Sequence, residues 1–345
     1  MGRDYMIINP SADDRATIQA ALDLYRVVEL AAGGVFILDS HLIVPSDRVL
    51  KCSSADRATI VRADSSKRTI VINGSNVLIK NLTIDFAFGG PWEEFASCIG
   101  FSFPDSDTTT PVQKSNIRLL NLRFVDSENN VTHTGGDAWA IDFRSDSPGI
   151  STGIEVIGCQ QLAPLRQLTA NGNGPGYDGV MIRGNKVVNG KSNSIAMSTS
   201  TTDFPMQFKN ITVRDNFLLG CQNIGIFIGQ DGQLISGSID LVNVLIENNY
   251  IGFEAGIPDF SICVLLRVGK GSGVGSGLVV DGNKFDVARA VASQPRSMQF
   301  EGRASDPLTF TNNRSLGVAQ PSLTQCSLTE SGNVFADGTS WSLLS

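Results

Sequence analysis

Residues Gly179–Val187 read GVMIRGNKV, with apolar residues at the second and fourth positions and Asn at the seventh. The same pattern returns in four later segments: NITVRDNFL (210–218), NVLIENNYI (243–251), GLVVDGNKF (277–285) and PLTFTNNRS (307–315). Three earlier segments keep the apolar pair without that Asn: NVLIKNLTI (76–84), NIRLLNLRF (116–124) and GIEVIGCQQ (153–161). The eight segments begin 40, 37, 26, 31, 33, 34 and 30 residues apart. Such a recurring short strand is typical of a solenoid, in which each coil buries its apolar side chains against its neighbours.

The composition favours strands over helices as the repeating unit. Of 345 residues 35 are Gly and only 18% are charged, unlike the charge-rich composition of helical repeats. A solenoid grows lengthwise, so we expect one continuous unit rather than two globular domains. The repeats and their flanking turns make roughly ten coils, which at about 4.8 Å per stacked strand predict a rod roughly 45–50 Å long.

One amphipathic helix is expected near the N-terminus. Over Ala16–Leu30 the apolar residues recur at helical spacing, and a Ser or Asp within 11–14 can cap the start. The Gly pair at 33–34 ends this segment, and Val35–Leu38 (VFIL) has the composition of a strand. A helix just before a β-solenoid most simply covers the open end of its core.

The stretch 12–63, ADDRATIQAALD…AAGGVFILDSHLIVPSDRVLKCSSADRATIVRA, carries a more specific signal. It resembles the N-terminal signature of the pectate-lyase-like superfamily, a right-handed parallel β-helix common in phage tailspikes, although LDSHLIV departs from the usual L-P-x-G-x-Y. The resemblance implies an all-β fold: a right-handed single-stranded parallel β-helix of roughly ten coils with an N-terminal capping α-helix. We therefore expect a short anchor or tail (1–10), a capping helix (11–34), the β-helix (35–325) and a terminal coil or C-terminal cap (326–345).

A second column of strands follows the first. Six alternating apolar segments lie 14 to 22 residues after their repeat starts: 98–103, 138–143, 194–199, 224–229, 262–268 and 297–302. In the first three, period-two alternation places Ser102, Asp142 and Ser198 on the outward side of one stacked column. Trp139 falls in the inward register and is expected in the core.

The loops between the two columns are long in the first three coils, at 85–97, 125–137 and 162–178. They shrink to 188–193 and 219–223 in the next two coils. Adjacent long loops on stacked coils would form a raised wall beside a flat strand face, and binding residues concentrate on such loops. We therefore expect the functional site in the N-terminal half of the rod.

Acidic and aromatic residues on this wall suit carbohydrate, because rings stack on sugars and paired carboxylates hydrolyse glycosidic bonds. The candidates for general acid and base are Glu94, Asp137 and Asp142. The candidates for substrate binding are Trp92, Glu93, His133, Tyr177 and Asp178. Taken singly, each carboxylate is more often a solvated loop residue than a catalyst. Carboxylates on adjacent coils would lie about 5 Å apart, as in retaining glycosidases, and those two coils apart roughly 9–10 Å, near the upper end for inverting ones.

Motifs of related enzymes are incomplete. NGNGPGYDGVMI (171–182) superficially resembles the N-T-D-G element of polygalacturonases, but the D-D pair and G-H-G of that family are missing, since no His follows His133. The D-P-H-E of mannuronan epimerases is also absent. No spacing recommends a lyase, so a glycoside hydrolase is the favoured enzyme class. With six Cys in no CxxC pair and only two His, the spacing of a zinc site is absent, and we assign no metal ligands and no cofactor. The many Asp residues leave a Ca²⁺ site with converging oxygen ligands open.

Charge and hydropathy exclude other classes. The formal net charge is −7 without any Lys/Arg-rich block, which argues against nucleic acid. No apolar run reaches 18 residues, so we predict no membrane insertion. The N-terminus lacks an apolar signal-peptide core, and most Cys lie inside apolar strands, which predicts buried free thiols and folding in a reducing cytoplasm. The repeated Asn are expected to shape turns, since Asn tolerates left-handed backbone.

Three functional interpretations remain. The first is a homotrimeric phage tailspike, made in the host cytoplasm and joined to other virion tail components, that binds a bacterial surface polysaccharide with or without cleaving it. Three rods side by side would bury long apolar stripes. The second is a secreted bacterial polysaccharide lyase or glycoside hydrolase without its signal peptide. The third is a structural β-helix that binds glycan without cutting it.

Overall fold

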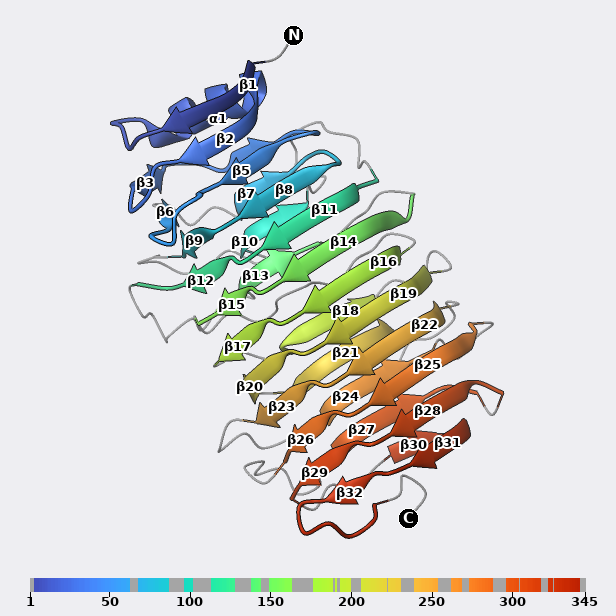
Figure 1. Ribbon diagram of the computed structural model, residues 1–345. Coiled ribbons are helices and arrows are strands. Elements are labelled where there is room, and N and C mark those ends of the chain that lie inside the picture. The colour runs from blue at the N-terminus through green and yellow to red at the C-terminus, as the bar shows by residue number, and fades with distance from the viewer. Residues whose placement is uncertain are drawn as a thin grey trace.

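The protein is a long stack of coils around one core, as the computed structural model in Figure 1 shows. The chain passes through three columns of strands in turn, and each pass adds one coil. The structure describes residues 3–62, 68–86, 96–101, 113–127, 138–143, 149–162, 176–188, 190, 193–199, 206–221, 223–230, 239–253, 262–268, 273–287, 296–303, 305–317, 322–324 and 326–341.

Two columns are continuous sheets along the rod. Sheet A contains, in spatial order, β1 (Arg3–Ile8), β2 (Tyr25–Leu30), β5 (Val49–Lys51), β8 (Val77–Lys80), β11 (Ser115–Leu120), β14 (Ser151–Ile157), β16 (Gly176–Arg183), β19 (Met206–Arg214), β22 (Ile239–Glu247), β25 (Gly275–Asp281), β28 (Pro307–Thr311) and β31 (Ser327–Ser331). Sheet B contains β3 (Val35–Leu38), β6 (Ala58–Arg62), β9 (Leu82–Asp85), β12 (Arg123–Val125), β15 (Gln160–Gln161), β17 (Lys186–Val188), β20 (Phe217–Cys221), β23 (Tyr250–Phe253), β26 (Lys284–Asp286), β29 (Arg314–Leu316) and β32 (Val334–Phe335).

The third column is divided in two. Sheet C contains β4 (Leu42–Val44), β7 (Arg68–Ile72), β10 (Ala96–Phe101) and β13 (Ala138–Asp142). Sheet D contains β18 (Ile195–Thr199), β21 (Ile224–Gln230), β24 (Ile262–Arg267), β27 (Arg296–Glu301) and β30 (Ser322–Thr324). These two sheets hold the predicted second column. Neighbouring strands pair in parallel in all four sheets, so the predicted parallel β-helix is confirmed.

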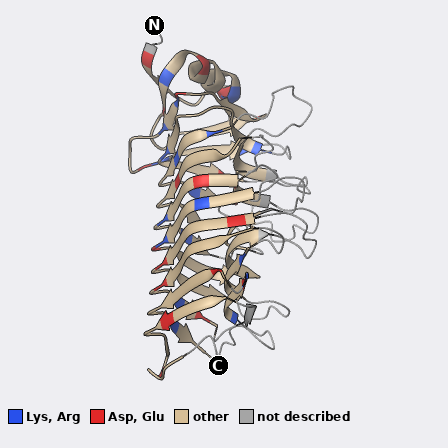
Figure 2. Cartoon of the chain, turned by 90° about the vertical axis from the view of Figure 1, so that its right-hand side faces the viewer, with Lys and Arg blue, Asp and Glu red and all other residues tan. Residues whose placement is uncertain are grey.

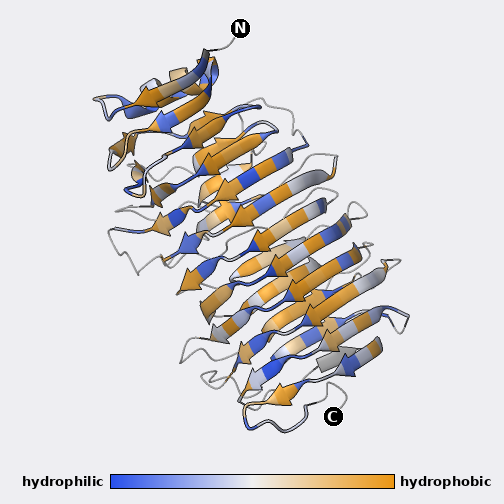
Figure 3. Cartoon of the chain, in the orientation of Figure 1, coloured by the Kyte–Doolittle hydropathy of each residue, from blue (hydrophilic) through white to orange (hydrophobic). Residues whose placement is uncertain are grey.

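The core follows from the alternation within each repeat. In sheet A the second residue of each nine-residue repeat stacks on its equivalent in the next coil, giving a buried column: Ile117, Ile154, Val180, Ile211, Val244, Leu278 and Leu308. Each such side chain contributes roughly 1.5–3 kcal/mol through burial. The apolar strand positions alternate with polar ones along the whole rod (Figure 3).

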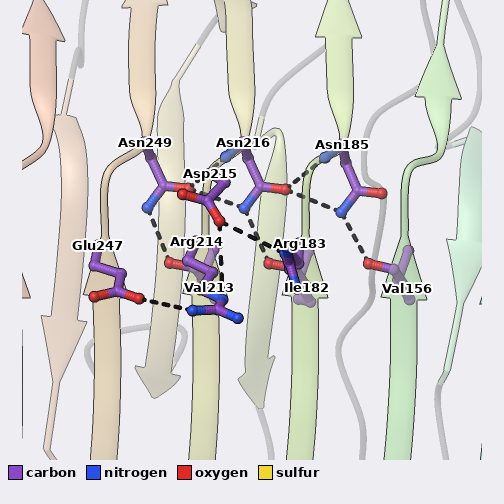
Figure 4. Close-up of polar contacts among 10 residues, drawn as sticks. All are labelled: Val156, Ile182, Arg183, Asn185, Val213, Arg214, Asp215, Asn216, Glu247 and Asn249. Carbon is purple, nitrogen blue, oxygen red and sulfur yellow. Dashed lines mark hydrogen bonds and ion pairs between the residues drawn. The ribbon is translucent and has the colours of Figure 1, made fainter.

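Each nine-residue repeat is two strands that meet at a corner, and the Asn at the corner forms an internal ladder. Asn216 donates through Nδ2 to Oδ1 of Asn249 at 2.9 Å and to the Ile182 carbonyl at 3.0 Å (Figure 4). Its own Oδ1 accepts from the backbone N–H and Nδ2 of Asn185, both at 2.9 Å. The same contacts continue through Asn283 and Asn313, which bonds to Asn333.

The prediction that these Asn residues take the left-handed backbone is wrong. The positive φ belongs to the residue before each of them: Gly184, Asp215, Asn248, Gly282 and Asn312. A side chain on the Asn position points inward, where backbone donors and acceptors would otherwise be buried without partners. The amide satisfies them, so the repeated Asn is a buried hydrogen-bonding residue and its neighbour makes the turn.

The N-terminal end is closed by α1 (Asp14–Leu24), whose N-cap Asp13 accepts from the backbone N–H of Ala16 at 2.9 Å. Ile18 and Leu22 are fully buried on its inner side. The helix ends six residues earlier than predicted, because Tyr25–Leu30 forms β2 and pairs with the next coil.

The segment predicted as an N-terminal tail is also part of the stack. Residues 3–8 form β1, which pairs in parallel with β2 along the edge of sheet A. At the other end Trp341 is buried against Phe310, with ring centroids 5.2 Å apart, and covers the last coils of the core.

The described cysteines are free, and five of the six are buried, as predicted. Burial raises the pKa of the Cys159 thiol to about 12, and of Cys221 likewise to about 12. In the part of the chain that the structure describes, no helix is long and apolar enough to span a bilayer.

Candidate functional site

The predicted wall is only partly within the described residues. Trp92, Glu93, Glu94, His133 and Asp137 lie outside them. The strands that follow these segments are described: β10 begins two residues after Glu94, and β13 begins directly after Asp137. Ala96 of β10 pairs with Ala138 of β13, so the two segments lead into adjacent coils.

Asp142 occupies the outer side of sheet C, opposite the core residue Ile141. Its neighbours along the column are Gly100 and Val71. The side chain is nevertheless fully buried. The expectation that Asp142 faces solvent as a catalytic acid is therefore corrected: its direction is as predicted, but this side of the sheet is covered.

A row of polar groups lies beside Asp142. Ser97 pairs with Arg68 on one side and with Trp139 on the other, and all three are buried. The Arg68 side chain packs over Gly100. A Cβ at position 100 would lie only 2.8 Å from Arg68 Nε, so only glycine leaves room for it. Trp139 is buried as expected, but it lies with this polar row outside the continuous apolar core cluster.

A second buried charge cluster lies near the junction of sheets B and C. Arg62 is 2% exposed and Asp85 is 7% exposed, and the Ser127 N–H donates to Asp85 Oδ1 at 2.9 Å. The pKa of the nearby Cys98 thiol is raised well above its usual value by burial and by the carboxylates of Asp85 and Asp126, while Arg62 opposes that rise. This cation and these carboxylates therefore interact within one low-dielectric region.

Sequence reasoning missed Arg62, Arg68 and Asp85 as members of the site region. Each ends or begins an apolar strand, in ATIVR, RTIVI and LTID. A charged residue at the end of an apolar strand could have indicated this region, because a buried charge needs a partner of opposite charge or hydrogen bonds. Most of each strand ribbon is uncharged, and Lys, Arg, Asp and Glu occupy a few positions along the rod (Figure 2).

Tyr177 belongs to the core and not to an exposed wall. It is 3% exposed, its hydroxyl donates to the Phe143 carbonyl, and its ring stacks near Phe208 at 6.1 Å. The prediction that Tyr177 contacts substrate is wrong, because its ring faces inward from the start of β16.

Asp178 is half-buried at the next position, where the chain bends into the main part of sheet A. Its Oδ1 accepts from Nδ2 of Asn210 at 2.7 Å, and Asn210 in turn accepts from Nδ2 of Asn243 at 3.0 Å. Asp178 thus ends a row of side-chain amides on the outer corner. This contact gives the carboxylate a structural role, and its role toward a ligand stays a prediction.

What the structure describes here is a buried polar layer, formed by Arg68, Ser97, Trp139 and Asp142 on neighbouring strands of sheet C. Within the described ranges, no three His, Cys, Asp or Glu side chains approach closely enough to hold a metal ion.

Comparisons with known proteins identify the fold. No model of a known protein family matches the sequence, and no curated protein matches it. The tailspike protein of E. coli bacteriophage HK620, solved in complex with a pentasaccharide, matches 97% of this chain with a TM-score of 0.61 and 15% sequence identity. A mutant of that tailspike in complex with a hexasaccharide matches the same share with a TM-score of 0.62 and 15% identity. The chain spans 67% and 66% of the length of these two proteins, and the likeness shows a shared tailspike-like β-helix fold.

Proposed function

We propose that this protein is a receptor-binding tailspike of a phage virion, and that it binds and cleaves a bacterial surface polysaccharide. The observation that carries the proposal is the match of nearly the whole chain to a tailspike solved with an oligosaccharide. At 15% identity this match concerns the fold, so the glycan ligand is inferred from the combination of that fold with the acidic and aromatic residues of the predicted wall.

The proposed catalytic pair is Glu94 and Asp137. The pairing of β10 with β13 supports adjacent positions, and adjacent strands lie about 4.8 Å apart, near the carboxyl separation of about 5–5.5 Å in retaining glycosidases. One carboxylate would attack the anomeric carbon while the other protonates the departing glycosidic oxygen. The second group would then take a proton from a water molecule, whose oxygen attacks the anomeric carbon and displaces the first carboxylate. Asp142 is set aside because a fully buried carboxylate does not reach a polymer at the surface.

Substrate contacts are proposed for Trp92, Glu93, His133 and Asp178, which come from the three long loops or their ends. Three chains are proposed to pack side by side as a homotrimer in the virion tail, together with other tail components. The half-buried aliphatic residues on the outer side of sheet A, among them Leu78, Leu245 and Val279, support such packing.

The test is incubation of the purified protein with surface polysaccharides from a panel of bacterial strains. We expect one of them to bind and to release new reducing ends without the ultraviolet absorbance of unsaturated uronates, which a lyase would produce. Glu94→Gln and Asp137→Asn should each slow cleavage by roughly 10²–10⁴-fold while binding persists. Glu155→Gln is the matched control and should cleave normally, because Glu155 is a half-buried carboxylate of sheet A that is ion-paired with Arg118 at 2.7 Å.

Each outcome decides between the interpretations. Binding without cleavage by the wild-type chain would make it a glycan-binding β-helix and would remove the catalytic pair. Unsaturated products would make it a lyase. Absence of both binding and cleavage across the panel would overturn the proposed function.

A further inference from the structure

The outward side of sheet B carries a straight column of side chains. The pairing registers align one residue from each of the eleven strands, from Val35 to Val334. Four of these positions hold cations and none holds an acid; the cations are Arg123, Lys186, Lys284 and Arg314. All four are exposed. This bias is opposite to the formal net charge of −7 of the whole chain.

Two aromatic residues occupy the middle of the column. Phe217 and Tyr250 follow Lys186 in successive coils (β20 and β23 in Figure 1), and their rings stack with centroids 4.9 Å apart and planes at 13°. Phe217 is 38% exposed. On the far side, the Lys284 ammonium lies 5.2 Å from the centre of the Tyr250 ring. The order along the rod is therefore cation, aromatic, aromatic, cation, cation.

The described acids beside the column have other partners. Asp286, two residues after Lys284 along β26, accepts from the Tyr250 hydroxyl at 2.6 Å. Asp215 lies at the corner toward sheet A, where it pairs with Arg183 at 3.6 Å and Arg214 at 3.9 Å. Arg314 donates to the Ala336 carbonyl at 3.0 Å. Within the described ranges no ion pair involves Arg123, Lys186 or Lys284.

We propose that this column binds an acidic polysaccharide that runs along the axis of the rod. Successive positions lie about 4.8 Å apart, close to the length of one sugar ring in an extended polymer, so sugars and side chains stay in step. The cations would bind carboxylates of the polymer, and the exposed ring edges with the aliphatic Lys stems would contact the apolar sides of the sugars. The inference rests on the proposed function and names its substrate class as anionic.

The spacing of the cations favours a polysaccharide over nucleic acid. Arg123 and Lys186 are two coils apart, and Lys186 and Lys284 are three coils apart, which gives about 10 and 14 Å. Duplex DNA presents one charge about every 1.7 Å along its axis and calls for denser cations. A polymer with an acid on every sugar, such as polygalacturonate, or on every second or third sugar would bring a carboxylate to each of these cations.

The experiment measures binding of polygalacturonate, neutral dextran and single-stranded DNA to the full chain at two salt concentrations. We expect polygalacturonate to bind, with weaker binding at higher salt, and dextran and DNA to bind at least roughly tenfold more weakly. The double variant Lys186→Ala/Lys284→Ala should lose roughly tenfold or more in polygalacturonate affinity and most of the salt dependence. Phe217→Ala should lose several-fold with the salt dependence unchanged.

Lys209→Ala is the matched control, because it removes a cation of β19 that lies outside the column, and its affinity should not change. Thermal unfolding of each variant confirms that it is folded. Equal affinity of the double variant and the control would overturn the inference, and so would tighter binding of DNA than of polygalacturonate. If the wild-type chain and the double variant bind a host polysaccharide equally well, the proposed role of the column is wrong and the proposed function is kept. If no host polysaccharide binds, the proposed function fails independently of the polygalacturonate result.

Discussion

The two halves of the rod fill the same corner position with opposite chemistry. The seventh residue of each repeat is apolar in the early coils, as Leu82, Leu122 and then Cys159, and is Asn from 185 to 333. In the later half the buried amides bond to one another and to backbone groups along the axis. At Leu82 and Leu122 in the early half the same place is held by apolar side chains.

The halves also differ in buried charge. Among the described residues, the buried acidic and basic side chains before Cys159 are Asp14, Arg62, Arg68, Asp85, Lys114 and Asp142, whereas after it only Asp306 is in this class. Burying such groups is costly unless they are paired, so a concentration of them marks a region under demands beyond stability. The later half therefore repeats one regular coil, whereas the early half contains the unequal loop lengths and most of the buried charged side chains.

Breaking the Asn ladder should give the largest effect. Asn249→Ala removes the acceptor for two donors of Asn216 and the donor to the Val213 carbonyl. Leaving these buried groups without partners should lower the free energy of unfolding by about 3–5 kcal/mol. Chemical denaturation measures it, with Asn248→Gly as control, because glycine takes the positive φ of that exposed position without strain. A loss below about 1 kcal/mol for Asn249→Ala would show that the ladder is not a cooperative support.

Removing a buried charge from the early half should stabilise the protein. Burial lowers the pKa of Lys114 to about 8, and its side chain is 1% exposed. Since the folded pKa lies below the unfolded value of about 10.4, the unfolded chain binds more protons between these values, and stability rises with pH from about 8 to 10.4. Lys114→Met should raise the free energy of unfolding at pH 7 by about 3 kcal/mol, and the stability of this variant should no longer rise between about pH 8 and 10.4. The measurement is the denaturation midpoint of both proteins across that pH range. If the midpoint of the wild type and that of Lys114→Met change with pH in the same way, the rise does not come from Lys114.

The smallest effect is expected where the two halves meet. The Cys159 N–H already donates to Asn185 Oδ1 at 2.8 Å, and its Sγ lies 3.6 Å from the Leu119 carbonyl, the place where an amide would donate. Cys159→Asn should therefore extend the ladder by one coil and change stability by less than about 1 kcal/mol. Leu82→Asn, deep in the apolar half, should cost about 3 kcal/mol or more. Equal losses for the two variants would refute the idea of a ladder that can be extended.

The fold was predictable because its signal is repeated. Apolar pairs such as Ile211 and Val213 recur in every coil, so an error at one repeat is corrected by the others. The helix boundary was not predictable in this way. Tyr25–Leu30 carries apolar residues that fit both a helix face and a strand, and pairing with β1 and β5 decides for the strand.

The site was less predictable, since exposure depends on what covers a strand. Period-two alternation gave the direction of Asp142 correctly, but it carries no information on the covering that buries it. The loop expected over 162–178 includes Tyr177, whereas this residue lies in β16 and its ring enters the core. The basic column of sheet B was readable as the eighth residue of each repeat, which is Lys, Phe, Tyr, Lys and Arg in the last five.

The most direct test of the account is the affinity of the intact chain for fragments of its host polysaccharide as a function of fragment length. A rod that binds a polymer along its axis predicts an affinity that rises with each added sugar over several coils and then levels off. An affinity that does not change with length, or no binding at any length, would contradict it.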